Sequence, residues 1–182
     1  MRRKTSRRSY AWAFKVIRLC TESDFDSIYE TINDGAEAYR GVIPSEIWKE
    51  PFVSRDYLAA EIQNGVQFYA FEDHGQLLGV MGVQHFDDVV LIRHSYVRTK
   101  HQRKGIGAGL VKHHLTHSQK PVLVGCLKAM TWAISFYEQH GFSLVSEDLR
   151  DILRAKYWTL SSTHVKHSVV LADRRWFSMF HQ

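Results

Sequence analysis

The sequence lacks several features that would place it in a specialised class of protein. It has only two cysteines, Cys20 and Cys126, which lie far apart in apolar segments. Two such thiols provide neither the disulfide framework of a small secreted protein nor the closely spaced ligands of a zinc site. No apolar run approaches the roughly 20 residues that span a bilayer, and no signal-peptide core follows the N-terminus. We therefore expect a cytoplasmic protein that has reduced cysteines, does not contact the membrane and needs no metal.

Acidic residues are outnumbered, but the imbalance is confined to one end of the chain. The 24 Lys and Arg residues exceed the 19 Asp and Glu residues, which gives a net charge of +5. Five basic residues near the N-terminus account for the whole surplus: Arg2, Arg3, Lys4, Arg7 and Arg8. The remaining chain is balanced and lacks the broad basic surface that is typical of nucleic-acid-binding proteins. We expect residues 1–13 to form a flexible basic extension, with an electrostatic tether to nucleic acid or acidic lipid as the alternative.

The rest of the chain has the composition of one globular domain. Hydrophobic residues make up 45% of the sequence and charged residues 24%, which is ordinary for a protein with a packed core. A length of 182 residues fits a single domain. We find no linker, repeat or low-complexity tract, so we expect one domain over residues 14–182.

The most informative segment is a basic turn at residues 97–109 that contains Gly105, Gly107 and Gly109. An apolar run typical of a strand precedes it, and helical apolar spacing follows it. Glycine lets the backbone approach a ligand, and the free N–H groups at a helix N-terminus attract phosphate. Arg98, Arg103 and Lys104 would supply the countercharge. The turn therefore predicts phosphate binding, with an ordinary glycine-rich turn as the alternative.

Two motifs make the chain similar to the GNAT superfamily of N-acetyltransferases. Gln102, Gly105 and Gly107 match the Q/R-x-x-G-x-G/A pattern of the family's acetyl-CoA-binding motif A. Residues 133–142 match its motif B, A-x-x-F-Y-x-x-x-G-F, at a distance typical of the family. The resemblance extends over nearly the whole chain beyond the N-terminal extension. One position departs from the family, which often has Asn three residues before the motif B alanine, where this chain has Met130.

The order of the predicted elements agrees with this resemblance. Strands are expected at residues 14–19, 67–71, 77–86, 89–98, 121–127, 143–146 and 168–172. Helices are expected at residues 24–39, once or twice within 45–64, after the glycine-rich turn, and at motif B. The expected fold is α+β (mixed α/β), with a central, mostly antiparallel sheet, flanking helices, and a splayed parallel pair formed by 89–98 and 121–127. A polar loop should precede the last strand, and the aromatic segment 176–180 should pack on the core, with a homodimer contact as the alternative.

The resemblance implies that acetyl-CoA is the cofactor and indicates where it binds. The pantetheine arm would lie in the gap between the two parallel strands and bond to the backbone there, while the glycine-rich turn would hold the pyrophosphate. The implied cofactor-binding residues are Tyr96, Val97, Arg98, Gln102, Arg103, Lys104, Gly105, Ile106, Gly107 and Ala108.

Acetyl transfer to an amine needs a proton donor for the departing thiolate and an acceptor for the amine proton. Tyr137 matches the motif B tyrosine, and a phenol with a reference pKa near 10 keeps its proton at neutral pH. The strand before the turn has no carboxylate, so His94 is the candidate base. Strand alternation predicts that Arg93 and His94 point to opposite faces, so that only one of them faces the substrate. Weaker candidates lie at hairpin ends: Glu72, Asp87 and Asp88.

These observations lead us to expect an acetyl-CoA-dependent N-acetyltransferase. It would transfer the acetyl group directly, within a ternary complex, to the primary amine of a small molecule or peptide. A catalytically weak or inactive acyl-CoA-binding sensor and a nucleic-acid-interaction protein that uses residues 1–8 are the alternatives. His113 and His117 have a spacing that could bind metal, but a solvated helix face is the simpler interpretation. Acceptor specificity is expected from residues 39–48 and 157–167.

Overall fold

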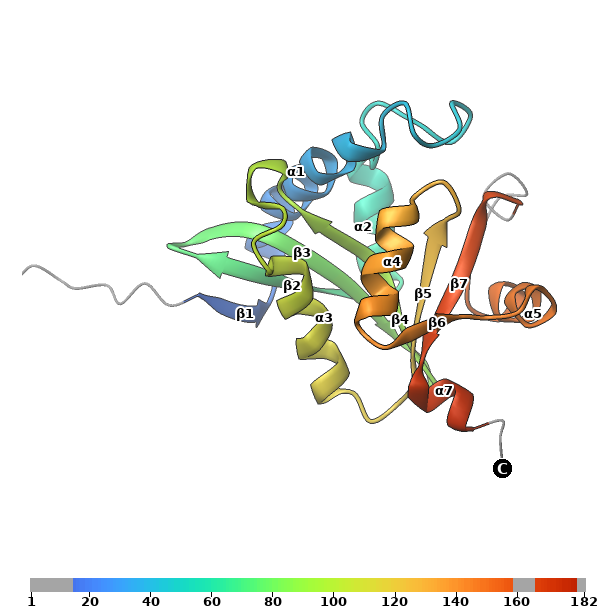
Figure 1. Ribbon diagram of the computed structural model, residues 1–182. Coiled ribbons are helices and arrows are strands. Elements are labelled where there is room, and N and C mark those ends of the chain that lie inside the picture. The colour runs from blue at the N-terminus through green and yellow to red at the C-terminus, as the bar shows by residue number, and fades with distance from the viewer. Residues whose placement is uncertain (1–14, 159–165, 180–182) are drawn as a thin grey trace, which may run out of the picture.

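The computed structural model describes residues 15–158 and 166–179 and contains one seven-stranded sheet with helices packed on both faces (Figure 1). The strands lie in the order β1-β2-β3-β4-β5-β7-β6, and β4 and β5 form the one parallel pair among them. Their bounds are β1 (Val16–Leu19), β2 (Val66–Asp73), β3 (Gln76–His85), β4 (Val90–Val97), β5 (Val122–Leu127), β6 (Phe142–Leu144) and β7 (Ser168–Asp173). The α+β prediction, with its mostly antiparallel sheet, is therefore confirmed.

The helices divide between the two faces of the sheet because alternate strand residues point to opposite sides. Their bounds are α1 (Phe25–Ala36), α2 (Arg55–Gln63), α3 (Ile106–His117), α4 (Thr131–Gln139), α5 (Glu147–Tyr157) and α7 (Arg174–Ser178). On one face, α1 and α2 pack on β2 and β3, and α5 packs farther along on β5 and β7. On the other face, α3 and α4 cover β3, β4 and β5. None of the helices in the described ranges is long and apolar enough to cross a membrane.

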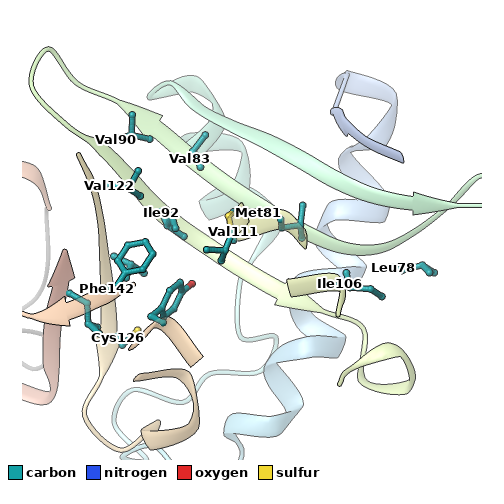
Figure 2. Close-up of a cluster of buried hydrophobic side chains, with 14 residues drawn as sticks. Leu78, Met81, Val83, Val90, Ile92, Ile106, Val111, Val122, Cys126 and Phe142 are labelled. Atoms are coloured by element: carbon teal, nitrogen blue, oxygen red, sulfur yellow. The ribbon is translucent and has the colours of Figure 1, made fainter. Parts of the chain in front are cut away.

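The core beneath α3 and α4 is the largest of the hydrophobic clusters. Met81, Ile92 and Val122 reach it from three neighbouring strands, and Ile106 and Val111 reach it from α3 (Figure 2). All of these side chains are buried. This packing fixes the N-terminal end of α3 against β3 and β4, which is where the glycine-rich turn lies.

The parallel strands β4 and β5 separate after a short paired stretch. Their register runs from Val90 opposite Val122 to Ile92 opposite Val124. Beyond this point β4 continues to Val97 along β3, whereas β5 continues to Leu127 along β7. The backbone edges that face each other across the gap are therefore released from pairing, and the predicted splay is confirmed.

A bulge interrupts β4 beside this gap. Gly82 on β3 lies opposite His94, but the next residue, Val83, lies opposite Ile92, so Arg93 is the extra residue on β4. Gly82 is required here, because a Cβ atom would come within 2.9 Å of the Phe68 ring. The bulge interrupts the regular alternation of side chains between the two faces of the sheet. The prediction that Arg93 and His94 point to opposite faces is consequently wrong, since both contact the same carboxylate.

Of two further regions, one differs from the sequence-based expectation, and the other, with one helix between residues 45 and 64, agrees with it. Residues 147–157, expected as part of a polar loop, form α5, which begins after Ser146 with acidic residues in its first turn and buries Leu153 and Tyr157. Between residues 45 and 64 the structure has one helix, α2, which Ser54 caps by accepting a hydrogen bond from the N–H of Tyr57; turns precede it. Trp176 on α7 is buried against α5 and β7, so this part of the aromatic segment packs on the core as expected. The basic extension predicted at residues 1–13 lies outside the described residues.

Candidate functional site

Two cavities flank the gap between β4 and β5. The first, of about 540 Å³, lies at the N-terminal end of α3, and the second, of about 530 Å³, lies between β4, β5 and α2. They share the lining residues Tyr39, Ser95, Tyr96, Ala133 and Tyr137. The cavities therefore adjoin each other along the splayed edge of β4, with Tyr137 at their junction.

The first cavity is bordered by unpaired backbone donors. Gly105 caps α3 with a φ of 81°, and Arg103 also has a positive φ, of 58°. The N–H of Gly109 is bonded to the carbonyl of Gly105, so the three preceding N–H groups have no acceptor within the helix. These groups belong to Ile106, Gly107 and Ala108, which line the cavity. A helix N-terminus of this kind favours an anion, and phosphate in particular.

Most of the residues predicted to bind the cofactor line this first cavity: Tyr96, Val97, Gln102, Arg103, Gly105, Ile106, Gly107 and Ala108. Arg98 and Lys104 are directed elsewhere. Arg98 donates hydrogen bonds to the Leu77 carbonyl at 2.9 Å and to Glu30 at 3.2 Å. The Nζ of Lys104 donates to the carbonyl of Lys100 at 2.9 Å. Among the Lys, Arg, Asp and Glu residues that the structure describes, Arg103 is thus the one that lines this cavity.

Three tyrosines line both cavities at their junction. Tyr137 is 4% exposed, and burial raises its pKa well above the ordinary value. Tyr39 and Tyr96 are partly buried, with ring centroids 5.8 Å apart, and removal from water likewise raises their pKa values. Each of these hydroxyl groups therefore keeps its proton at neutral pH.

Cys126 lies on β5 in the lining of the second cavity. Burial raises the pKa of its thiol to about 12, so the thiol is protonated at neutral pH and is a poor nucleophile. Cys20 is also a free thiol, and burial raises its pKa to about 12 as well. The two cysteines are not linked to each other in the structure.

The second cavity contains a buried cluster of charged and titratable groups. Glu61 on α2 accepts hydrogen bonds from Arg93 Nη2 to Oε1 at 2.9 Å and from Arg93 Nε to Oε2 at 3.2 Å. His94 Nε2 lies 3.1 Å from the same Oε2. Burial acts to raise the pKa of Glu61, but the bond to His94 and the Arg93 guanidinium outweigh it and lower the pKa below its ordinary value. The carboxylate is therefore ionised at neutral pH.

The site residues predicted from the sequence did not include Glu61, although its helical spacing from Leu58 was a weak indication that it is buried. It lies three residues after Leu58 in a segment predicted to be helical, and these two residues form the buried face of α2. Two of the carboxylates that were considered as candidate bases, Asp88 and Glu72, form hydrogen bonds or ion pairs with other residues. Asp88 accepts bonds from Lys156 and Tyr157, and Glu72 pairs with Arg18. None of Glu72, Asp87 and Asp88 lines either cavity within the described part of the chain.

Aromatic side chains form much of the remaining wall of the second cavity. Phe52, Tyr57 and Trp158 contribute rings, and Ile47 reaches it from the predicted specificity segment 39–48. Of the other predicted specificity segment, 157–167, residues 159–165 lie outside the described residues. The cavity thus combines aromatic and aliphatic walls with charged groups, namely the Glu61 cluster, Lys49 and Arg154, which suits an organic molecule that has polar groups.

The histidines of α3 lie apart from this site. His113 and His117 have ring centroids 4.4 Å apart, and His117 Nδ1 is hydrogen-bonded to the His113 carbonyl. Within the described ranges, no group of three or more His, Cys, Asp and Glu side chains is placed to hold a metal ion. The His113–His117 pair makes a local contact on one helix.

Comparisons with known proteins agree with this geometry. A family model described as the acetyltransferase (GNAT) domain matches residues 30–151. No protein of curated function matches the sequence significantly.

Three solved structures illustrate the similarity of fold. PaiA N-acetyltransferase from Thermoplasma acidophilum, in complex with coenzyme A, has a TM-score of 0.67 at 16% identity, over 88% of this chain and 98% of that one. The ribosomal-protein-S18-alanine N-acetyltransferase of Escherichia coli has a TM-score of 0.61 at 14% identity, over 88% and 93%. N-acetylglutamate synthase from Neisseria gonorrhoeae, complexed with coenzyme A and N-acetyl-glutamate, has a TM-score of 0.64 at 24% identity, over 90% of this chain and 35% of that one.

Proposed function

The chain belongs to the GNAT acetyltransferase family, and on this premise we propose that it transfers an acetyl group from acetyl-CoA to a primary amine within a ternary complex. The observation that carries the proposal is the position of Tyr137, where a cavity with phosphate-binding character adjoins a cavity that contains His94 and Glu61. Two ligands bound in these cavities would meet beside one buried phenol. Direct transfer needs such a meeting point.

The first cavity fits the diphosphate part of acetyl-CoA. The N–H groups of Ile106, Gly107 and Ala108 are free to donate, and Arg103 adds positive charge. At Gly105 no atom lies within 4 Å of where a Cβ would be, so the approach to the backbone is open. When bound, acetyl-CoA supplies the acetyl thioester. The splayed edge of β4 near Tyr96 and Val97 would hold its pantetheine arm, as the family resemblance implies.

We assign the two proton transfers to Tyr137 and His94. The Tyr137 hydroxyl keeps its proton because burial raises its pKa, so it can donate to a sulfur atom that gains negative charge. His94 lines the second cavity and can accept the proton of the incoming amine. The protonated Cys126 thiol supports direct transfer, since an acyl-cysteine route would need a thiolate.

The proposal is tested by following thiol release from acetyl-CoA with a panel of small-molecule amines and peptides that have free N-termini. We expect release that depends on an amine and saturates with it. Calorimetric titration with coenzyme A, run in parallel, measures binding without chemistry. Binding without release for every acceptor would instead identify an acyl-CoA-binding sensor.

A further inference from the structure

We infer that Glu61 is a positioning residue: it orients His94 as the base, and Arg93 in turn holds Glu61. This inference rests on the proposed function, because it assigns His94 a role in acetyl transfer. It adds a residue from α2 that belongs to neither sequence motif, and it specifies which nitrogen of His94 accepts the proton.

The three side chains form a closely packed, mostly buried group. Arg93, Glu61 and His94 have exposed side-chain fractions of 14%, 9% and 7%. Arg93 reaches both oxygens of the carboxylate, so the position of Glu61 is determined by two contacts from one guanidinium. A buried carboxylate next to an imidazole stabilises the protonated ring, because their charges are opposite and poorly screened. The ionised Glu61 carboxylate thus lies beside the ring that is proposed to accept the proton.

The hydrogen bond to Glu61 selects one tautomer of His94. An ionised carboxylate can only accept, so the Nε2 atom at 3.1 Å must carry the hydrogen. In neutral His94 the lone pair is therefore on Nδ1. The bond to Glu61 is the one hydrogen bond that the His94 side chain makes within the described part of the chain. Since His94 lines the acceptor cavity, Nδ1 is the nitrogen left to receive the amine proton.

Aromatic neighbours fix the plane of the imidazole. Phe68 stacks on it with ring centroids 5.5 Å apart and an interplanar angle of 28°, and Tyr57 meets it edge-on at 6.3 Å. These contacts oppose rotation about the Cβ–Cγ bond, which would exchange Nδ1 with Cδ2 and Nε2 with Cε1 and so turn Nε2 away from Glu61. Gly82 leaves the room that Phe68 needs for this contact.

The β4 bulge explains how two consecutive residues reach one carboxylate. In a regular strand, Arg93 and His94 would lie on opposite faces of the sheet. Because Arg93 is the extra residue of the bulge, its side chain turns to the same side as that of His94. Bulges are often found beside active sites, where they redirect a side chain. A purely structural ion pair between α2 and β4 would not need both residues.

The inferred step is one proton transfer. The N–H bond of the substrate ammonium breaks, its electron pair remains on nitrogen as the nucleophilic lone pair, and the proton forms a bond to Nδ1 of His94. Nε2–H stays hydrogen-bonded to Glu61, which remains ionised throughout. The proton then leaves His94 for solvent, so the residue is ready for the next turnover.

The tautomer can be tested without any turnover. Long-range ¹H–¹⁵N spectra at mildly alkaline pH distinguish Nε2–H from Nδ1–H in neutral histidine, and the His94→Gln spectrum assigns the signal. We expect wild-type His94 to be the Nε2–H tautomer and Glu61→Ala to lose that preference. An Nδ1–H tautomer in the wild-type protein would overturn the inference. The wild-type tautomer is determined on the unmodified chain, so a folding defect in Glu61→Ala would not obscure it.

Kinetics test the catalytic consequence. Glu61→Gln keeps the shape of the side chain but removes its charge, and we expect kcat to fall about 10- to 100-fold, as for other residues that orient a functional histidine. The KM for acetyl-CoA should not change. The dependence of the rate on pH should also change, because Glu61→Gln removes an ionised carboxylate that lies 3.1 Å from His94. Glu61→Asp should recover part of the rate.

Glu72→Gln is the matched control, because Glu72 also forms a partly buried ion pair, with Arg18 at 2.6 Å, but lies outside both cavities. If Glu61→Gln and Glu72→Gln change kcat and its pH profile equally, the role of Glu61 is structural only. If the wild-type chain releases no thiol, the proposed function fails, while the tautomer still decides whether Glu61 orients His94. If the wild-type chain is active and Glu61→Gln leaves its pH profile unchanged, only the inference fails.

Discussion

Gln102 is hydrogen-bonded to the strand that precedes it: its Nε2 donates to the Val97 carbonyl at 3.1 Å. This bond links the glycine-rich turn to the end of β4. The motif A glutamine, Gln102, thus stabilises the conformation of the turn. Val97 was predicted to contact the cofactor through its backbone, so Gln102 and the cofactor would share the same short segment.

Replacing Gln102 by Leu should weaken acetyl-CoA binding because the turn loses its tie to β4. The net value of one such hydrogen bond is about 0.5–1.5 kcal/mol, which corresponds to roughly 2- to 12-fold in affinity. Calorimetric titration measures the change. Gln84→Leu is the control, since its Nε2 also donates to a backbone carbonyl, that of Asn64 at 2.8 Å, away from both cavities. Equal affinities for the two variants would argue against a role for Gln102 in shaping the site.

Gly105→Ala should impair both stability and binding. Its φ of 81° is in the left-handed region, where a non-glycine residue costs about 1–2 kcal/mol. Relief of this strain would rotate the N–H groups at the start of α3 away from the ligand. Gly141, with a φ of 86° and equally open surroundings, lies outside both cavities. Gly141→Ala should therefore lower the free energy of unfolding by a similar amount and leave the coenzyme A affinity intact.

Arg103→Gln should weaken acetyl-CoA binding more than Arg98→Gln does. Arg103 lines the first cavity, whereas Arg98 is engaged by the Leu77 carbonyl and Glu30. The loss in Arg103→Gln should be largest at low salt, because exposed charges are screened at higher ionic strength. Arg98→Gln should instead lower the free energy of unfolding. Measurements of acetyl-CoA affinity at several salt concentrations separate an effect on binding from an effect on stability. A larger loss of affinity in Arg98→Gln than in Arg103→Gln would show that the Arg98 side chain turns to the cofactor.

Tyr137→Phe should reduce kcat about 100-fold or more, because it removes the proposed proton donor. Affinity for acetyl-CoA should be nearly unchanged, since the ring that fills the junction of the cavities remains. Single-turnover rates and coenzyme A titrations provide the comparison. Tyr69→Phe serves as the control, because Tyr69 packs on His113 and His114 of α3, outside both cavities. Full activity of Tyr137→Phe would rule out the assigned acid.

Asp24→Asn should destabilise the protein at neutral pH. The carboxylate accepts bonds from Arg18 at 2.8 Å and from the Thr21 N–H at 2.8 Å, and the Arg18 guanidinium holds the pKa of Asp24 well below its usual range. Hydrogen bonds to a charged group contribute about 1.5–3 kcal/mol, and we expect a loss of this order.

The effect of Asp24 should also depend on pH. A pKa lower in the folded than in the unfolded state means that the unfolded chain binds more protons in acid. The stabilisation is therefore complete above the unfolded carboxyl pKa of about 4 and is lost as pH falls below it. Denaturant titrations at a series of decreasing pH values should show that the free energies of unfolding of the wild-type protein and Asp24→Asn converge. Asp26→Asn, whose carboxylate is 73% exposed, should change stability by less than about 1 kcal/mol at neutral pH.

Much of the fold could be predicted from the sequence because its signals are local. The strands of the sheet, the helix after the glycine-rich turn and the motif B helix follow from apolar spacing over a few residues. The α5 helix was missed because its polar composition resembles a loop, although Ser146 and the acidic residues after it are a helix-start signal. The glycine-rich turn was recognised because backbone freedom and free N–H groups are properties of a short segment.

The cluster of Glu61, Arg93 and His94 depends on contacts between residues that lie far apart in the sequence. Glu61 lies 32 residues before Arg93 and 33 before His94, and it meets them only after α2 packs on the sheet. The bulge that turns both side chains toward it depends on the register between β3 and β4. Likewise, the direction of Arg98 depends on Glu30 and Leu77 from two other elements. The sequence by itself determined the elements and the glycine-rich turn, since these arise from neighbouring residues; the tertiary structure decided which side chains line the second cavity, because packing and strand register bring distant residues together.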